Sequence, residues 1–275
     1  MNSTAIWALR TVLLAAVVLA AAMTPQLGQS GPQSSTREPA TKSSQKNAVV
    51  YMDRSEGYMH AEKYAEAAEG YKKVVAIEPP NATAYFGLAI SQSAPKQWRP
   101  AEEAASRYIS LCEHPEPVVY VTLGRAQQQQ GKLQEAAEAY GKAIASNPSQ
   151  EMLQVAHDER GLIHFQLKQY QAAIRDFQEV LKVDPEDEEG NLGLARSYMQ
   201  DRETLNAIKV LRAFLVPHPE NSSGHFYLGL CYVVLGNRTF AEHEYQIVLG
   251  LDKKTAQSMR ELLDGARKGS KKTEP

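Results

Sequence analysis

The feature that most constrains this chain is a motif that returns about every 35 residues from residue 48 to residue 253. Six times, an alanine is followed four residues later by a large and usually aromatic side chain. Residues four apart share one face of a helix, so each pair marks a buried helical stripe. Such a period predicts a repeat architecture in which neighbouring copies stack into one core. The pairs are Ala67/Tyr71, Ala104/Tyr108, Ala136/Tyr140, Ala173/Phe177, Ala207/Leu211 and Ala241/Tyr245.

Each copy carries further markers around its alanine. A small residue stands twelve positions earlier, except in the second copy, where Ala89 precedes Ala104 by fifteen. Two small residues let two helix backbones approach closely, and a proline ends most copies because it cannot continue a helix. Gly131 and Gly236 stand where the chain must reverse between helices. The small residues are Ser55, Ala89, Gly124, Gly161, Ala195 and Gly229, and the prolines are Pro79, Pro115, Pro148, Pro185 and Pro219.

With these markers the chain resembles the tetratricopeptide repeat (TPR) family, whose unit is a helix–turn–helix of about 34 residues. The third copy follows the family pattern nearly throughout, from Tyr120, Leu123, Gly124 and Gln127 to Ala136 and Tyr140. The resemblance implies an all-α fold, a right-handed superhelical solenoid of six helix–turn–helix repeats with a C-terminal capping helix. The expected repeats are residues 48–81, 82–116, 117–150, 154–187, 188–221 and 222–254, with a cap at 255–267 and a polar tail at 268–275.

The copies depart from a regular period in two places. The second copy is predicted to carry three extra residues between its helices, within residues 93–100, and the junction near residues 149–152 carries three more. The cap is expected to place one apolar stripe on the last repeat, as a terminal helix of a stacked array must. That stripe is Ala256, Met259, Leu262, Leu263 and Ala266.

The N-terminal segment has the pattern of an export signal. Residues 11–23 form an uncharged apolar run after Arg10, which is shorter than the roughly 20 residues that span a bilayer. Small residues favour cleavage after Ala22, so residues 1–22 are predicted to be a signal peptide, with an uncleaved membrane anchor as the alternative. Residues 23–47 are rich in Pro, Ser, Gln and Thr and are predicted to be a disordered linker.

Composition excludes several classes of protein. The formal net charge of −2 gives no basic excess for binding nucleic acid. Two cysteines, Cys112 and Cys231, are too few for a disulfide scaffold or a four-cysteine zinc site. With three repeats between them, both are expected to be free, buried and structural.

No catalytic or cofactor motif is recognisable. His157 and His164, with Asp158 and Glu159 nearby, are the best candidates for a metal site, but they fall at core positions of the fourth repeat and lack metal-ligand spacing. We therefore expect packed core histidines, no metal, no cofactor and no enzyme. The acidic run 186–189 is expected at the positive end of a helix dipole.

What remains is a binding surface. The resemblance to TPR proteins implies a concave groove lined by the first helices, which binds a protein or peptide segment. Arg125 and Arg196 are the hypothesised contacts for a carboxylate of that partner. Trp98 is a further candidate contact on a loop. The groove residues carried over are Phe86, Ile90, Arg125, Gln128, Leu162, Phe165, Arg196, Met199, Phe226 and Leu230.

The sequence therefore favours a non-enzymatic interaction scaffold outside the cytoplasm, periplasmic or secreted, and membrane-tethered if the N-terminus is not cleaved. The alternative is an assembly factor for an envelope machine of the pilus or secretin type, and a metal- or small-molecule-binding enzyme subunit is the third hypothesis. Sequons at Asn81, Asn221 and Asn237 would be glycosylation acceptors in a eukaryotic secretory pathway.

Overall fold

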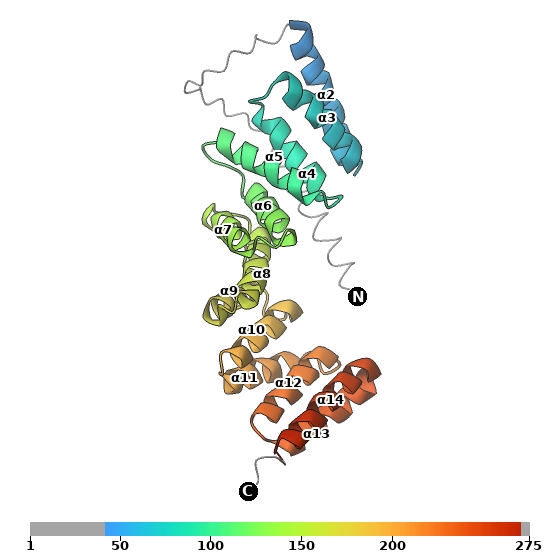
Figure 1. Cartoon of the computed structure of the whole chain (residues 1–275), viewed down its shortest axis with the longest axis vertical. Coiled ribbons are helices and arrows are strands. Elements are labelled where there is room, and N and C mark those ends of the chain that lie inside the picture. Colours follow the sequence, from blue (N-terminus) through green and yellow to red (C-terminus); the bar gives the residue numbers. More distant parts are fainter. Residues whose placement is uncertain (1–41, 271–275) are drawn as a thin grey trace. The chain divides into compact units, whose positions relative to one another are not determined.

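The computed structural model describes residues 42–270, and side chains within residues 43–264. The described part of the chain is helical throughout and contains no strand (Figure 1). The predicted signal peptide, most of the predicted linker and the end of the predicted tail lie outside the described residues. The chain divides into two compact units, Met1–Leu153 and Gln154–Pro275.

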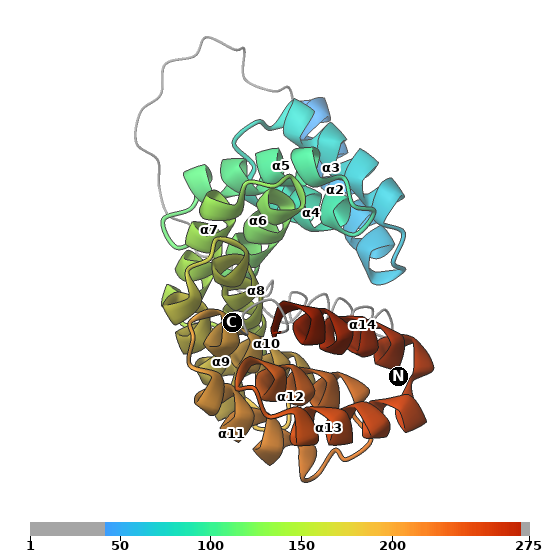
Figure 2. The same ribbon diagram turned by 60° about the horizontal axis from the view of Figure 1, so that its bottom comes forward.

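Unit 1 contains three helix pairs, in which each helix packs on the next one along the chain. The first helices of the pairs, α2, α4 and α6, also contact one another, and Figure 2 shows them on one side of the unit with their partners on the other. The helices are α2 (Lys42–His60), α3 (Tyr64–Ile77), α4 (Ala82–Ser93), α5 (Trp98–Leu111), α6 (Pro117–Gln129) and α7 (Leu133–Ala145).

Unit 2 continues the same arrangement with three more pairs and a final helix. The boundary between the units falls inside α8, and first helices again neighbour one another, α10 beside α12 and α12 beside α14. The predicted all-α fold of stacked helix pairs is confirmed in each unit. The helices are α8 (Gln150–Gln166), α9 (Tyr170–Val183), α10 (Glu188–Gln200), α11 (Thr204–Leu215), α12 (Ser222–Val234), α13 (Arg238–Leu251) and α14 (Lys253–Ser270).

The small residues of the motif are where neighbouring helices meet. All six motif alanines are buried, and so are the six small residues of the first helices. Phe177 of α9 shows why they are small: a Cβ on Gly161 of α8 would lie 3.1 Å from its ring, and one on Gly193 of α10 only 2.5 Å. One aromatic ring thus packs against the first helix of its own repeat and of the next.

The turn inside every pair has one geometry. In each of the six, the backbone N–H of the N-cap residue of the second helix donates to the carbonyl five residues earlier, as Lys132 does to Gln127 at 2.9 Å. The residue before each N-cap has positive φ. Gly131 and Gly236 supply this conformation without steric cost, as the sequence predicts. The other four turns use Glu62, Lys96, Lys168 and Arg202.

Most first helices begin at a side chain that caps the exposed backbone N–H groups. Asn81 accepts from Ala84 N–H at 2.9 Å, and Asn221 accepts from Gly224 N–H at 2.8 Å. Asp187, inside the acidic run, caps α10 by accepting from Gly190 N–H at 2.7 Å. The expected placement of that run at a helix N-terminus is correct, since Glu188 and Glu189 occupy the first turn of α10.

The predicted insertion in the second repeat is wrong. The turn places the N-cap of α5 at Gln97, so that Ala101, not Ala104, occupies the motif position. Ala101 lies twelve residues after Ala89, the same interval as in every other repeat. The sequence was ambiguous because Ala101, Ala104 and Ala105 are all buried in α5, and Tyr108 packs one turn further along than the motif expects.

Two other boundaries differ from expectation. The extra residues near 149–152 form no loop: they lengthen α8, which has 17 residues where α10 and α12 have 13. Helix α2 begins at Lys42, so residues 42–47, predicted to belong to a disordered linker, are helical.

Helix α14 packs on α12 and α13, where Ala256, Met259 and Leu263 are buried. These three face Phe226, Tyr232, Val233 and Tyr245. Leu262, predicted in the same stripe, is 48% exposed because it lies one residue off the buried 256–259–263 spacing. The helix therefore covers the apolar face that the sixth repeat would otherwise expose.

Candidate partner-binding face

The first helices of unit 2 present a row of partly exposed apolar side chains. Leu162 and Phe165 of α8 pack beside Ala173 and Phe177, and Met199 of α10 packs against the next core cluster. Each of these side chains is half-buried, packed along one edge against the core and exposed along the other. The predicted groove residues of unit 2 are all half-buried: Leu162, Phe165, Arg196, Met199, Phe226 and Leu230.

Arg196 of α10 lies between aromatic rings of two neighbouring helices. Its guanidinium carbon is 4.7 Å from the ring centroid of Phe165 on α8 and 5.8 Å from that of Tyr227 on α12. Phe226 meets Tyr227 edge to face, with ring centroids 5.3 Å apart. These cation–π contacts with two rings hold the guanidinium in place on this face.

No residue that the structure describes forms a hydrogen bond or ion pair with Arg196. A planar, pre-oriented guanidinium can donate two parallel hydrogen bonds to one carboxylate. The surrounding apolar side chains exclude water from such a pair and strengthen it. Chemically, this face is suited to a segment that combines a carboxylate with apolar side chains.

The predicted groove residues of unit 1 are also half-buried, and some of them have internal partners. The ring of Phe86 packs edge to face on Tyr108, with centroids 5.4 Å apart. Gln128 accepts a hydrogen bond from the Tyr140 hydroxyl at 3.1 Å. Ile90 and Arg125 complete the set. Arg125 and Arg196 belong to different units, so their joint contact with one carboxylate stays a prediction.

Trp98 does not lie on a loop, as the sequence suggested. It is the first residue of α5 and is half-buried, because the turn of the second repeat ends one residue earlier, at Gln97. A role for Trp98 as a contact residue stays a prediction.

A buried ionic cluster in unit 2 was missed by sequence reasoning. Asp176 of α9 accepts from Nδ1 of His157 at 2.9 Å and from Nδ1 of His164 at 2.8 Å. Arg160 adds bonds from Nε at 3.1 Å and from one terminal nitrogen at 2.6 Å. All three donors come from α8, so this carboxylate fastens α8 to α9. His157 is buried, as expected, and His164 is half-buried; both are also hydrogen-bonded to a charge.

The pKa of Asp176 reflects two opposing effects. Burial by itself raises it, but the hydrogen bonds from His157, His164 and Arg160 outweigh burial and hold the pKa well below the usual range of an aspartate. The carboxylate is therefore ionised at neutral pH. A carboxylate accepts but does not donate, so both Nδ1 atoms carry the shared hydrogens.

A related pair lies two repeats further on. His225 of α12 donates from Nδ1 to Glu244 of α13 at 2.6 Å, and both are buried. His157/Asp176 and His225/Glu244 are each nineteen residues apart and are separated by 68 residues, twice the repeat length. This recurring spacing could have indicated both histidine–carboxylate pairs from the sequence.

The cluster does not form a metal site. Among residues 42–270, no group of three or more His, Cys, Asp or Glu side chains is arranged to hold a metal ion. His157 and His164 direct a ring nitrogen at Asp176, and Arg160 occupies the same carboxylate with positive charge. Cys112 and Cys231 are both free, but only Cys231 is buried as predicted; Cys112 is half-buried because it stands at the C-terminal end of α5. Burial raises the pKa of the Cys231 thiol to about 12, so it stays protonated at neutral pH.

Comparison with known proteins agrees with this architecture. Family models of the tetratricopeptide repeat match residues 117–150, 159–187 and 192–253. No curated protein sequence matches the chain. Among its described helices, none has the length and apolar character to cross a membrane.

Several solved structures resemble the chain. PilF of Pseudomonas aeruginosa has 18% identity and a TM-score of 0.57, over 80% of this chain and 99% of PilF. YrrB, described as a TPR protein with an unusual peptide-binding site, has 16% identity and a TM-score of 0.61, over 70% of this chain and 99% of YrrB. MamA of Desulfovibrio magneticus RS-1, from residue 41 to its end, has 19% identity and a TM-score of 0.57, over 63% of this chain and 96% of that one. At these identities the likeness shows the fold alone.

Proposed function

Because the chain is a tetratricopeptide repeat protein, we propose that it binds a carboxylate-bearing peptide segment of a partner protein on the first-helix face of unit 2. Scaffolding of protein–protein interactions, rather than catalysis, is the general role of this family. The proposal concerns which face is used and what chemistry the partner carries.

The observation that carries the proposal is the position of Arg196. It is stacked on Phe165 and Tyr227, has no ionic partner among the described residues, and is flanked by half-buried Met199 and Phe226. A pre-oriented arginine among aromatic and methionine side chains has the composition of an interface hot spot. Apolar side chains of the partner would pack beside Met199 and Phe226 while its carboxylate pairs with Arg196.

Site-specific photocrosslinking in the native host tests whether the partner contacts the first-helix face of unit 2. A benzophenone side chain at Met199 is expected to capture a partner segment, whereas one at exposed Arg175 on α9 is not. Mass spectrometry of the crosslink identifies the segment, which is then synthesised for binding measurements. Equal capture at both positions would show that the first-helix face has no preference for a partner.

The affinity of the protein for that synthetic segment tests the role of Arg196. Arg196→Ala is expected to weaken binding at least about tenfold, and Arg196→Lys nearly as much, because an ammonium cannot stack and donate bidentately. Arg175→Ala is the matched control and leaves affinity unchanged. Unchanged affinity of Arg196→Ala contradicts the proposed role of the arginine.

We also propose that the chain works outside the cytoplasm, periplasmic or secreted. This rests on the apolar run of residues 11–23 and the small residues before the cleavage site. Alkaline phosphatase fused after residue 47 is expected to be active in a bacterial host and inactive when residues 1–22 are deleted. The envelope-assembly alternative stays a prediction, because the likeness to PilF concerns the fold.

A further inference from the structure

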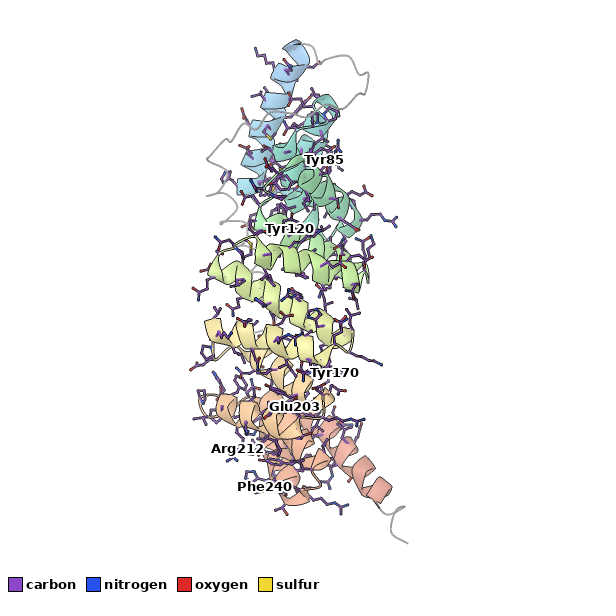
Figure 3. The ribbon with its side chains drawn as sticks, turned by 90° about the vertical axis from the view of Figure 1, so that its left-hand side faces the viewer. Tyr85, Tyr120, Tyr170, Glu203, Arg212 and Phe240 are labelled. Atoms are coloured by element: carbon purple, nitrogen blue, oxygen red, sulfur yellow. The ribbon has the colours of Figure 1, made fainter. Side chains whose placement is uncertain are left out.

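The opposite side of unit 2 carries an apolar cleft that the first-helix face does not include. It has a volume of about 490 Å³ and lies between α11 and the turn from α12 to α13. Leu205 and Ile208 of α11 form one wall, and Leu235 and Phe240 form the other. We call it the α11–α13 cleft. Figure 3 shows Arg212 and Phe240, which both line it, close together on the same side of the unit.

The walls of the cleft expose large apolar side chains. Leu205 is 64% exposed, Phe240 52% and Leu235 47%, and Val234 beside them is 65% exposed. Phe240 packs on Tyr232, with ring centroids 5.1 Å apart, so its ring is held in place. A contiguous exposed apolar patch of this kind is unusual on a protein that binds no partner there.

The repeats supply an internal comparison, because every second helix starts from the same turn. Counted from the N-cap, Leu205 corresponds to Gln134 and Gln171 in the two preceding repeats. Phe240 corresponds to Glu66, Pro100, Glu135, Ala172 and Asn206, and Val234 to His60, Ala94, Gln129, Gln166 and Gln200. The fold therefore does not require large apolar residues at these positions. Their presence in unit 2 needs another reason.

The charges around the cleft favour an acidic ligand. Lys209 and Arg212 are the only charged residues of α11, and both are exposed. No described residue forms an ion pair with Arg212. Of the nearby carboxylates, Glu244 itself lines the cleft and accepts a hydrogen bond from His225 at 2.6 Å, and Glu242 pairs with Arg260 at 3.3 Å. The cleft thus offers apolar walls and an exposed cation that forms no ion pair with a described residue.

We propose that the α11–α13 cleft is a second binding surface, which takes an acidic amphipathic helix of a partner protein. The helix inserts apolar side chains between Leu205 and Phe240 and places a carboxylate beside Arg212. A concave cleft of this volume accommodates a few side chains, whereas membrane docking needs protruding apolar groups and several cations. The cleft is lined by none of the predicted groove residues, so the proposal is independent of the proposed function.

Fluorescence anisotropy with two synthetic peptides tests the proposal on the full chain. One probe is an 18-residue amphipathic helix of Leu, Ala and Glu, and the other has Lys in place of every Glu. The Glu peptide is expected to bind. Leu205→Gln and Phe240→Asn, each copied from an equivalent position of this chain, are expected to weaken binding at least about tenfold. Arg212→Glu is expected to reverse the preference between the peptides.

Leu251→Gln is the matched control. Leu251 is 45% exposed and lies outside the cleft, so we expect its substitution to leave binding unchanged. Circular dichroism establishes that every variant is folded, as expected for exposed sites. Equal binding of the two peptides, or insensitivity to Leu205→Gln and Phe240→Asn, overturns the proposal. A third outcome also overturns the proposal: neither peptide binds, the protein sediments with phosphatidylcholine–phosphatidylglycerol vesicles (3:1), and Leu205→Gln and Phe240→Asn abolish that sedimentation. In that case the cleft binds a membrane.

Discussion

Single residues in the turns carry conformations that their side chains disfavour. Four of the six turns place a charged residue at positive φ, as Lys168 does at 60°. Left-handed backbone costs about 1–2 kcal/mol for a residue with a Cβ, while glycine adopts it freely. The same turn therefore exists in a relaxed form at Gly131 and in a strained form at Lys168.

Replacing Lys168 by glycine should stabilise unit 2. We expect Lys168→Gly to raise the free energy of unfolding by about 0.5–1 kcal/mol, since relief of strain exceeds the added entropy of the unfolded chain. Urea denaturation monitored by circular dichroism measures it. Gly131→Ala in the matching turn should lower stability instead, and a stabilising Gly131→Ala would contradict the account.

Glycines at helix crossings have a different purpose, because they make room rather than permit a turn. Gly193 lies under the ring of Phe177, and an added Cβ would meet it at 2.5 Å. We expect Gly193→Ala to destabilise the protein by about 1–3 kcal/mol through overpacking. Gly57, in the last turn of α2 with nothing within 4 Å, is the control: Gly57→Ala should stabilise by about 0.5–1 kcal/mol. Thermal unfolding distinguishes the two.

At the scale of helices, α8 and α9 are joined by charge as well as by packing. Asp176 is buried and accepts from three side chains of α8. Its pKa is lower in the folded protein than the roughly 3.9 of an unfolded aspartate. Its contribution to stability is therefore fully present above that unfolded value and is lost as the pH falls through the folded value.

Removing the carboxylate should change both stability and its pH dependence. Asp176→Asn leaves buried donors unpaired, and we expect a loss of about 3–5 kcal/mol at pH 7. The decrease in melting temperature between about pH 4 and 2 should then be shallower than in the wild type. Asp53→Asn, exposed on α2, is the control and should keep the wild-type profile. Parallel profiles for wild type and Asp176→Asn would contradict the prediction.

For the molecule as a whole, the last helix completes the stack. Met259 of α14 is fully buried against α12, where it packs over Gly229. In a stacked repeat protein each repeat covers its neighbour, so the final one needs a cap. Without α14, the side chains of Phe226, Tyr232 and Tyr245 would lose their cover.

Truncation after Asp252 should therefore produce a protein that exposes apolar surface. We expect increased binding of an apolar fluorescent dye, a lower melting temperature and aggregation during size-exclusion chromatography. Truncation after Ser270, which removes only a polar tail, is the control and should leave these measurements unchanged. A monomeric, unchanged protein after the longer truncation would show that α14 is not a cap.

The sequence by itself determined the repeat, the helix pairs and the buried small residues, because each follows from side chains at short, recurring spacings. It also indicated the row of first-helix residues around Arg196 through the TPR resemblance. Tertiary structure decided the rest. Three alanines at helical spacing left the register of α5 open until the turn at Gln97 set it. The pairing of Asp176 with α8 joins residues 12–19 positions apart on two helices, and the α11–α13 cleft exists only where a turn and a helix from consecutive repeats meet. Such contacts depend on how helices dock, and spacing along the chain indicates them only where it recurs, as for His157/Asp176 and His225/Glu244.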